Sequence, residues 1–193
     1  MKISAAATVA FTLTALLALA GCASTPGTGG RHDEMPGMSA SASADVNDAD
    51  IQFTTMMIPH HQQAVEMADV ILAKDDIDEQ VVALAEQIQT AQGPEIKQME
   101  AWLDDWGIDM GNISGMGDGM MSDTDMEALE DATVNEASRL FLEQMTEHHQ
   151  GAIEMAQTEV DNGQNPDVIS LAQNIITSQT PEIATMTEIL ATL

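Results

Sequence analysis

Apolar residues recur along the chain at the three- and four-residue spacing that gives a helix one apolar face. The first such segment runs from Asn47 or Asp48, either of which can cap a helix, to about Ala73. At roughly 100° per residue, its apolar stripe has His60 at the centre and His61 at the edge. The pattern therefore predicts an amphipathic helix that turns a histidine inward.

Three further segments show the same periodicity. They are predicted from about Glu79 to Trp106, from about Asp125 to Val160, and from about Asp167 to Leu193. Polar turns, Lys74 to Asp78 and Asp161 to Pro166, separate the two members of each pair. The chain therefore reads as two helical hairpins.

Two prolines leave helix boundaries open. Pro59 predicts either a kink or a helix that starts there, because proline lacks the N–H that an inner turn requires. Gly93 and Pro94 either start a new helix with Glu95 in its first turn, or lie within a continuous helix that turns Glu95 toward the core. The same two alternatives hold for its counterpart Glu182.

The two hairpins are copies of one another. Residues 57–68 and 145–156 both read Met-x-x-His-His-Gln-x-Ala-x-Glu-Met-Ala. These two stretches contain four histidines of the five in the chain, so the duplication is centred on paired His and Met.

The spacing between the copies shows what was duplicated. His60 and His148 are 88 residues apart, whereas Met99 and Met186 are 87 apart. A loop tolerates a one-residue difference and a continuous helix does not, so each copy is two helices joined by a loop. The predicted fold is all-α: an antiparallel four-helix bundle from two duplicated hairpins, whose long connection also permits the ferritin-like crossover.

Composition narrows the possible ligands. The 193 residues include 15 Met, 3% aromatic residues and no Tyr, which favours a helical interior over a sheet. Five Lys and Arg against 32 Asp and Glu give a formal charge of −27. Such a surface repels nucleic acid and anionic lipid, so we expect neither as a partner.

The N-terminal region has the pattern of an export signal. Residues 1–21 carry Lys2 and then an uncharged apolar run, ending in Leu-Ala-Gly before Cys22, which resembles the lipobox of bacterial lipoproteins. We expect lipidation at Cys22, a flexible tether over 22–48, and the bundle domain over 49–193. The protein would then be extracytoplasmic and anchored to a bacterial membrane by its lipid.

A Gly-rich polar loop at about 107–124 joins the hairpins and contains Met110, Met116, Met120 and Met121. Such sequence cannot form a core of its own, so packing does not readily explain its methionines. Capture of a soft metal ion is an alternative role.

Paired imidazole and thioether groups suggest a metal. Thioether sulfur is a poor ligand for Mg, Ca or Zn but suits Cu(I), and imidazole suits copper. Met57 and His61 lie four residues apart, as do Met145 and His149, so each pair could hold an ion from one helix face. Alternatively, Met fills core gaps and the inner His is hydrogen-bonded to Glu95 or Gln92.

The two His-His blocks, each followed by Gln-x-Pro-Glu-Ile-x-x-Met, resemble the bacterial "domain of unknown function 305" family over about residues 50–193. This resemblance implies an exported, ferritin-like bundle and, in CopM-like members, copper binding and copper tolerance. Carried onto this chain, the family's metal-binding pattern points to Met57, His60, His61, Met67, Met99, Met145, His148, His149, Met155 and Met186.

Two other functions stay open. A di-iron centre in this fold needs inward Glu residues and Glu-x-x-His pairs, but Glu66 and Glu154 face away from the stripe, and only Glu95 and Glu182 could serve. A metal-free acidic interaction module is the second alternative. No arrangement typical of hydrolases or kinases is present, so we expect no enzymatic activity.

We therefore predict an extracytoplasmic copper-binding protein that acts as a buffer, chaperone or tolerance factor, with Cu(I) held by Met and His. Association into homo-oligomers stays open.

Overall fold

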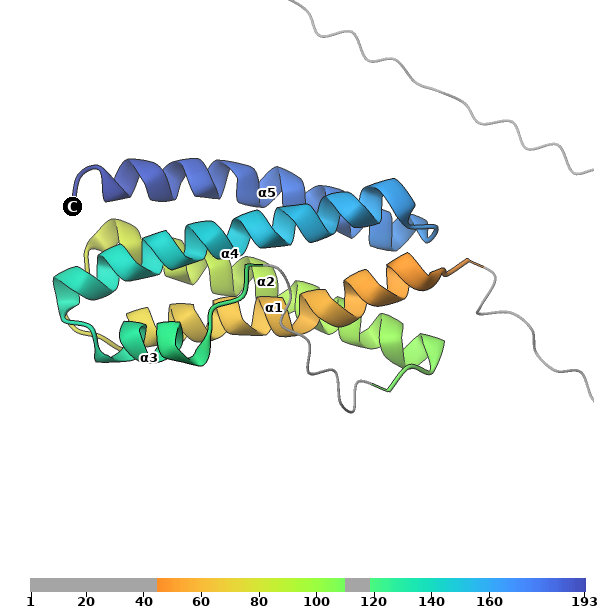
Figure 1. Ribbon diagram of the computed structural model, residues 1–193, viewed down its shortest axis with the longest axis horizontal. Coiled ribbons are helices and arrows are strands. Elements are labelled where there is room, and N and C mark those ends of the chain that lie inside the picture. The colour runs from red at the N-terminus through yellow and green to blue at the C-terminus, as the bar shows by residue number, and fades with distance from the viewer. Residues whose placement is uncertain (1–44, 110–118) are drawn as a thin grey trace, which may run out of the picture. The chain divides into compact units, whose positions relative to one another are not determined.

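The computed structural model describes residues 45–109 and 119–193, and within these ranges the chain forms helices and no strand. The helices are α1 (Asp48–Leu72), α2 (Glu79–Trp106), α3 (Asp123–Asp131), α4 (Val134–Asn162) and α5 (Pro166–Leu190). Figure 1 shows the four long helices lying along a common direction.

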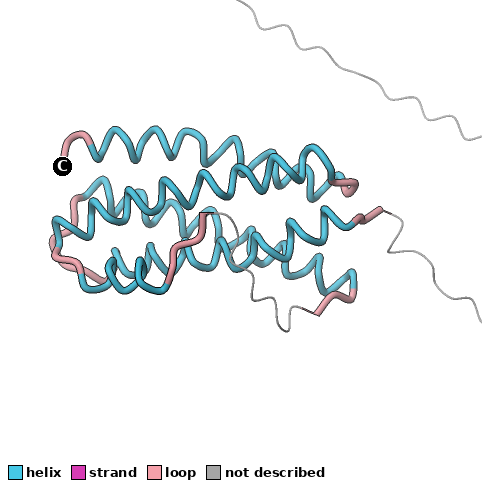
Figure 2. The backbone as a smooth tube through the Cα atoms, viewed as in Figure 1, coloured by secondary structure: helices cyan, strands magenta, loops and turns pink. Residues whose placement is uncertain are grey.

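The long helices pair as predicted. α1 packs along α2, α4 packs along α5, and the two hairpins meet mainly through α1 and α4. Figure 1 shows α1 and α4 running in opposite directions, and Figure 2 shows the short loops that close each hairpin. The all-α bundle of two duplicated hairpins is therefore confirmed.

Both internal prolines lie inside continuous helices. α1 begins after Asn47, whose side chain accepts hydrogen bonds from the N–H groups of Ala49 and Asp50, and it continues through Pro59. α2 likewise continues through Pro94. The alternative helix starts at these two prolines are wrong, because the apolar stripes on both sides of each proline stay buried on one face.

The predicted helix from Asp125 to Val160 is also wrong, since it is two helices. α3 ends at Asp131 and α4 starts at Val134, after an extended residue at Ala132. The Glu136 carboxylate caps the new helix by accepting from the Thr133 hydroxyl at 2.6 Å and its N–H at 3.3 Å. Lys74 secures the break by donating to the Ala132 carbonyl at 3.1 Å.

The chain that precedes α3 is held tightly against the bundle. The Gln63 side chain accepts from the Met121 N–H at 2.7 Å and donates to its carbonyl at 2.9 Å. Gly119 has a φ of +80°, and a Cβ there would lie 2.8 Å from the Glu147 carbonyl oxygen and 2.9 Å from the Cα of Gly151. Only glycine fits both this backbone conformation and this contact.

A buried carboxyl pair joins the start of α1 to the end of α4. The Asp50 carboxylate accepts from the Asn47 N–H at 2.6 Å and from the N–H of Asn165 at 2.8 Å. Glu159 is 1% exposed. Burial, then its hydrogen bond to Asp50 and the charge of Asp50, raise the pKa of Glu159 to about 8. At neutral pH the pair therefore holds a proton.

Several predictions for the N-terminal region and the loop stay predictions. The signal peptide over 1–21, lipidation at Cys22 and most of the tether lie outside the described residues, as do Met110 and Met116. Across 45–109 and 119–193, none of the helices combines the length and apolar character needed to cross a membrane.

The glycine contact predicts opposite effects at two positions. Gly119→Ala should lower the free energy of unfolding by about 2 kcal/mol or more, because its Cβ meets backbone at a positive φ. Gly93→Ala, in α2 with nothing within 4 Å of a Cβ, should raise it by about 0.5–1 kcal/mol. Urea unfolding measures both, and equal effects would contradict this account of Gly119.

The carboxyl pair predicts how stability depends on pH. The pKa of Glu159 is raised from 4.5 to about 8, so the folded state binds a proton that the unfolded state has lost in this range. This contribution to the free energy of unfolding should fall by at most about 1.4 kcal/mol per pH unit as pH rises from 4.5 to 8. Glu159→Gln should remove the slope and the exposed control Glu154→Gln should not, as measured by urea unfolding at several pH values.

Candidate metal centre

Two histidines meet where α1 crosses α4. The ring centroids of His60 and His148 are 3.7 Å apart, with the ring planes tilted by 43°. Both side chains are buried, and so are their neighbours His61 and His149. Because α1 and α4 are antiparallel copies of one sequence, equivalent residues face each other at the middle of their contact. The crossing therefore contains a layer of four buried imidazoles.

The outer histidine of each copy is paired with a carboxylate of its own hairpin. The Nε2 atom of His61 lies 2.9 Å from Glu95, and that of His149 lies 2.8 Å from Glu182. The open question about these glutamates is thereby settled, since both turn toward the histidine layer. The Glu95 carboxylate lies beside the outer histidine, His61, because α2 continues through Pro94.

Each pairing fixes the ring chemistry. A carboxylate only accepts, so Nε2 of His61 and of His149 carries a proton, and a neutral ring then keeps a lone pair on Nδ1. Within the described ranges, Nδ1 of both rings is buried without a hydrogen-bond partner, as are both nitrogens of His148. Buried polar atoms that lack partners are rare and costly, so these nitrogens are suited to a ligand such as a metal ion.

The environment keeps His148 neutral. Burial lowers the pKa of His148 well below 6.5, and the nearby rings of His60, His149 and His61 lower it further. An interaction with the His60 backbone acts in the opposite direction. Neutral imidazole is the form that binds metal ions, so His148 is ready to act as a ligand at neutral pH.

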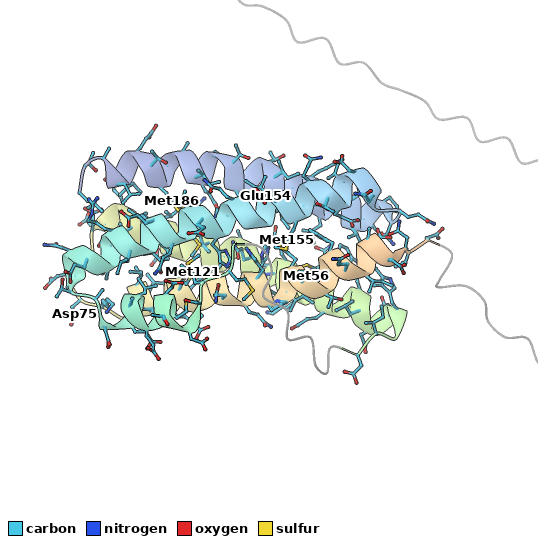
Figure 3. All side chains as sticks on the ribbon, viewed as in Figure 1. Met56, Asp75, Met121, Glu154, Met155 and Met186 are labelled. Atoms are coloured by element: carbon cyan, nitrogen blue, oxygen red, sulfur yellow. The ribbon has the colours of Figure 1, made fainter. Side chains whose placement is uncertain are left out.

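Methionines lie on both sides of the histidine layer. Met57 and Met99 belong to one apolar cluster, and Met145 and Met186 belong to the other. Along α1 and α4 the histidines fall between these clusters, so buried thioethers border the layer on two sides. Figure 3 shows Met186 and Met121 to the left of Met155 and Met56 along the bundle.

Eight of the ten predicted metal-binding residues form this layer or the clusters that border it, whereas Met67 and Met155 lie two helical turns beyond the inner histidines. Nine of the side chains are buried: Met57, His60, His61, Met67, Met99, Met145, His148, His149 and Met186. Met155 is half-buried against the cluster that contains Met57.

The arrangement differs from a site built of carboxylates and imidazoles alone. Across residues 45–109 and 119–193, no three His, Cys, Asp or Glu side chains come together in a way that could hold a metal ion. Glu66 and Glu154 are exposed, as predicted, so they cannot bridge irons in the core. What the fold does bring together is an imidazole pair in a core rich in thioethers, a donor set that suits a soft ion.

Two residues outside the layer escaped the sequence reasoning. Gln63 holds Met121, which is 6% exposed and part of the core. The signal was present in the repeat, because Gln63 aligns with Gly151 and so marks a position where the two copies differ. Glu159 was missed because a single acidic residue near a helix end has no distinctive pattern.

The fold and the site define a duplicated helical-bundle protein with a buried His and Met core. The family model for the "domain of unknown function (DUF305)" matches residues 50–190, and the chain belongs to this family. The resemblance seen in the sequence is thereby confirmed.

Solved structures agree with this assignment. A DUF305 fragment from Deinococcus radiodurans is 34% identical with a TM-score of 0.71, covering 77% of this chain and 99% of that one. A DUF305 protein from Streptomyces coelicolor, described as secreted, is 33% identical with a TM-score of 0.70, covering 74% and 92%. CopM in its Cu(I)-bound form is 33% identical with a TM-score of 0.66, covering 74% and 96%. No curated protein matches the chain.

The carboxylate pairing predicts a stability difference between two substitutions. Glu182→Ala leaves the buried Nε2 of His149 without its acceptor, so the free energy of unfolding should fall by about 1–3 kcal/mol. Glu182→Gln keeps an acceptor oxygen and should cost less. Glu188→Ala, exposed on the same helix, should change stability by no more than about 0.5 kcal/mol. Equal losses for all three variants in urea unfolding would contradict a structural role for the pair.

Proposed function

We propose that this protein is an extracytoplasmic copper-binding protein that holds Cu(I) at the α1–α4 crossing and serves as a buffer, chaperone or tolerance factor rather than as an enzyme. The observation that carries the proposal is the ring contact of His60 and His148 at 3.7 Å, within a buried core bordered by methionines.

The donors at the crossing fit a soft ion. His148 contributes a neutral imidazole whose nitrogens have no hydrogen-bond partner in the described part of the chain. Met57 and Met145 lie one helical turn before the inner histidines and are fully buried. Thioether and imidazole together favour Cu(I), since common divalent ions such as Mg, Ca and Zn bind thioether poorly.

The carboxylate pairs support the site from outside. Glu95 and Glu182 fix the proton of His61 and His149 on Nε2. The lone pair of each neutral ring is then on Nδ1, which is the nitrogen that can bind a metal ion. Carboxylates that orient an imidazole in this way are common behind metal ligands and raise ligand basicity. A His61 or His149 oriented by its carboxylate can thus join the coordination when a central ion is bound.

Relatives support the choice of metal and location. CopM has been solved with Cu(I), with Cu(II) and with Ag. This chain is 33% identical to CopM over 96% of the CopM chain. The description of the Streptomyces coelicolor relative as secreted supports a location outside the cytoplasm. A bound metal cargo also accounts for four histidines in a core where apolar residues would pack at lower cost.

Anaerobic competition titration with a chromogenic Cu(I) chelator tests the proposal, with Zn(II) and Fe(II) titrated alongside. The double variant His60→Ala with His148→Ala should lose at least about tenfold in Cu(I) affinity, because it removes the two facing imidazoles.

The matched control is Gln62→Ala with Gln150→Ala, which changes exposed residues of the same two motifs and should bind Cu(I) as the unchanged protein does. Cu(I) affinity that survives in the double histidine variant would place copper elsewhere. Binding of Fe(II) alone would instead support a di-iron protein.

A further inference from the structure

The internal repeat creates two equivalent grooves between α1 and α4, and among the described residues a further helix covers only one of them. α3 packs on both helices and covers the groove that contains Met67 and Ile71, which are fully buried. Within this groove, Gln144 on α4 donates to the Asp125 carbonyl of α3 at 3.0 Å. The equivalent groove, between the first half of α1 and the last half of α4, contains a cavity of about 290 Å³.

The residues of the second groove differ from their counterparts in a consistent way. At the repeat offset of 88, Ile71 in the covered groove corresponds to Glu159 in the open one, and Gln144 corresponds to Met56. Met67 has its counterpart in Met155. The covered groove is an apolar surface on which α3 packs, whereas the open groove has two thioethers and a carboxyl group.

These groups line one cavity from both helices. Met56 comes from α1 and Met155 from α4, and both side chains are half-buried. Figure 3 shows the two methionines near the middle of the bundle, with Glu154 on the same helix as Met155. Phe53 closes the floor at 5% exposure and the exposed Glu154 borders the mouth, so the thioethers are reachable from solvent.

Glu159 gives the cavity a buried carboxyl group that could exchange its proton for a cation. It lines the cavity at 1% exposure, and in the described part of the chain neither carboxyl oxygen receives a hydrogen bond from a donor group. Its neighbour is Asp50, a second carboxyl group. The described residues that line the cavity include no Lys or Arg. A cation at this place would replace the proton that Glu159 and Asp50 hold at neutral pH, and the sulfur atoms select a soft one.

We propose that this groove is a second metal site, in which Met56, Met155 and Glu159 bind a soft monovalent ion such as Cu(I) or Ag(I). Met56 lies four residues before His60, one helical turn away on α1. The groove therefore gives an ion a route from solvent to the histidine layer. This role as an entry site rests on the proposed function. Binding of an ion in the groove does not depend on it.

Titration of the full-length protein with Ag(I), followed by NMR of methionines labelled with ¹³C at the methyl group, tests the site. The methyl signals of Met56 and Met155, assigned by substitution, should shift in the first equivalents of Ag(I). In the double variant Met56→Leu with Met155→Leu, one equivalent should be lost or bind at least about tenfold more weakly. Leu keeps the side-chain volume close to that of Met, so the fold is preserved.

A matched control and a second variant separate the possible outcomes. Met126→Leu, on α3 at the covered groove, should bind Ag(I) as the unchanged protein does. His60→Ala with His148→Ala should retain the shifts of Met56 and Met155 even if the central site is lost. Unshifted methyl signals at these two residues, or full stoichiometry and affinity in their double Leu variant, would overturn the inference whatever the histidine layer binds.

Discussion

The close approach of α1 to α4 sets the positions of the four buried histidines at the candidate metal centre. Two imidazole rings with centroids 3.7 Å apart require the helices to meet over small side chains. Each copy of the motif supplies them one and two turns beyond its inner histidine, as Ala64 and Ala68 on α1 and Ala152 and Ala156 on α4, all fully buried. The spacing of alanine and histidine in one motif thus determines both the packing of the hairpins and the chemistry between them.

The same packing explains why the core tolerates polar groups. An unpaired imidazole in an apolar interior costs stability, and Glu95 and Glu182 offset this cost at the outer rings. Among residues 45–109 and 119–193 no carboxylate pairs with His148, and its environment keeps it neutral instead. A protein selected for stability alone would have apolar residues here, so the retained cost indicates a function that needs the nitrogen atoms.

The sequence predicted the features that depend on local pattern. Periodicity gave the two hairpins, Asn47 gave the start of α1, and the repeated His and Met residues gave the buried layer. Features that depend on competition between local and tertiary effects were not predictable in this way. The apolar stripe favours one continuous helix through Thr133, whereas capping at Thr133 favours a new helix start, and the sequence alone does not show which prevails. Helical phase alone likewise could not decide whether Glu95 faces the core.

The differences between the two copies carry as much information as their likeness. A duplicated hairpin produces paired grooves, and α3 can cover one because Gly151 admits Gly119 where the other copy has Gln63. Gln63 in turn binds the backbone of Met121 and holds the chain that leads into α3. One groove thereby serves the packing of α3. The other groove does not pack against α3, and it contains Met56 and Glu159 where the covered groove has residues that contact α3. In a molecule built from two copies of one unit, function is therefore best sought where the copies agree in the core and where they differ at the surface.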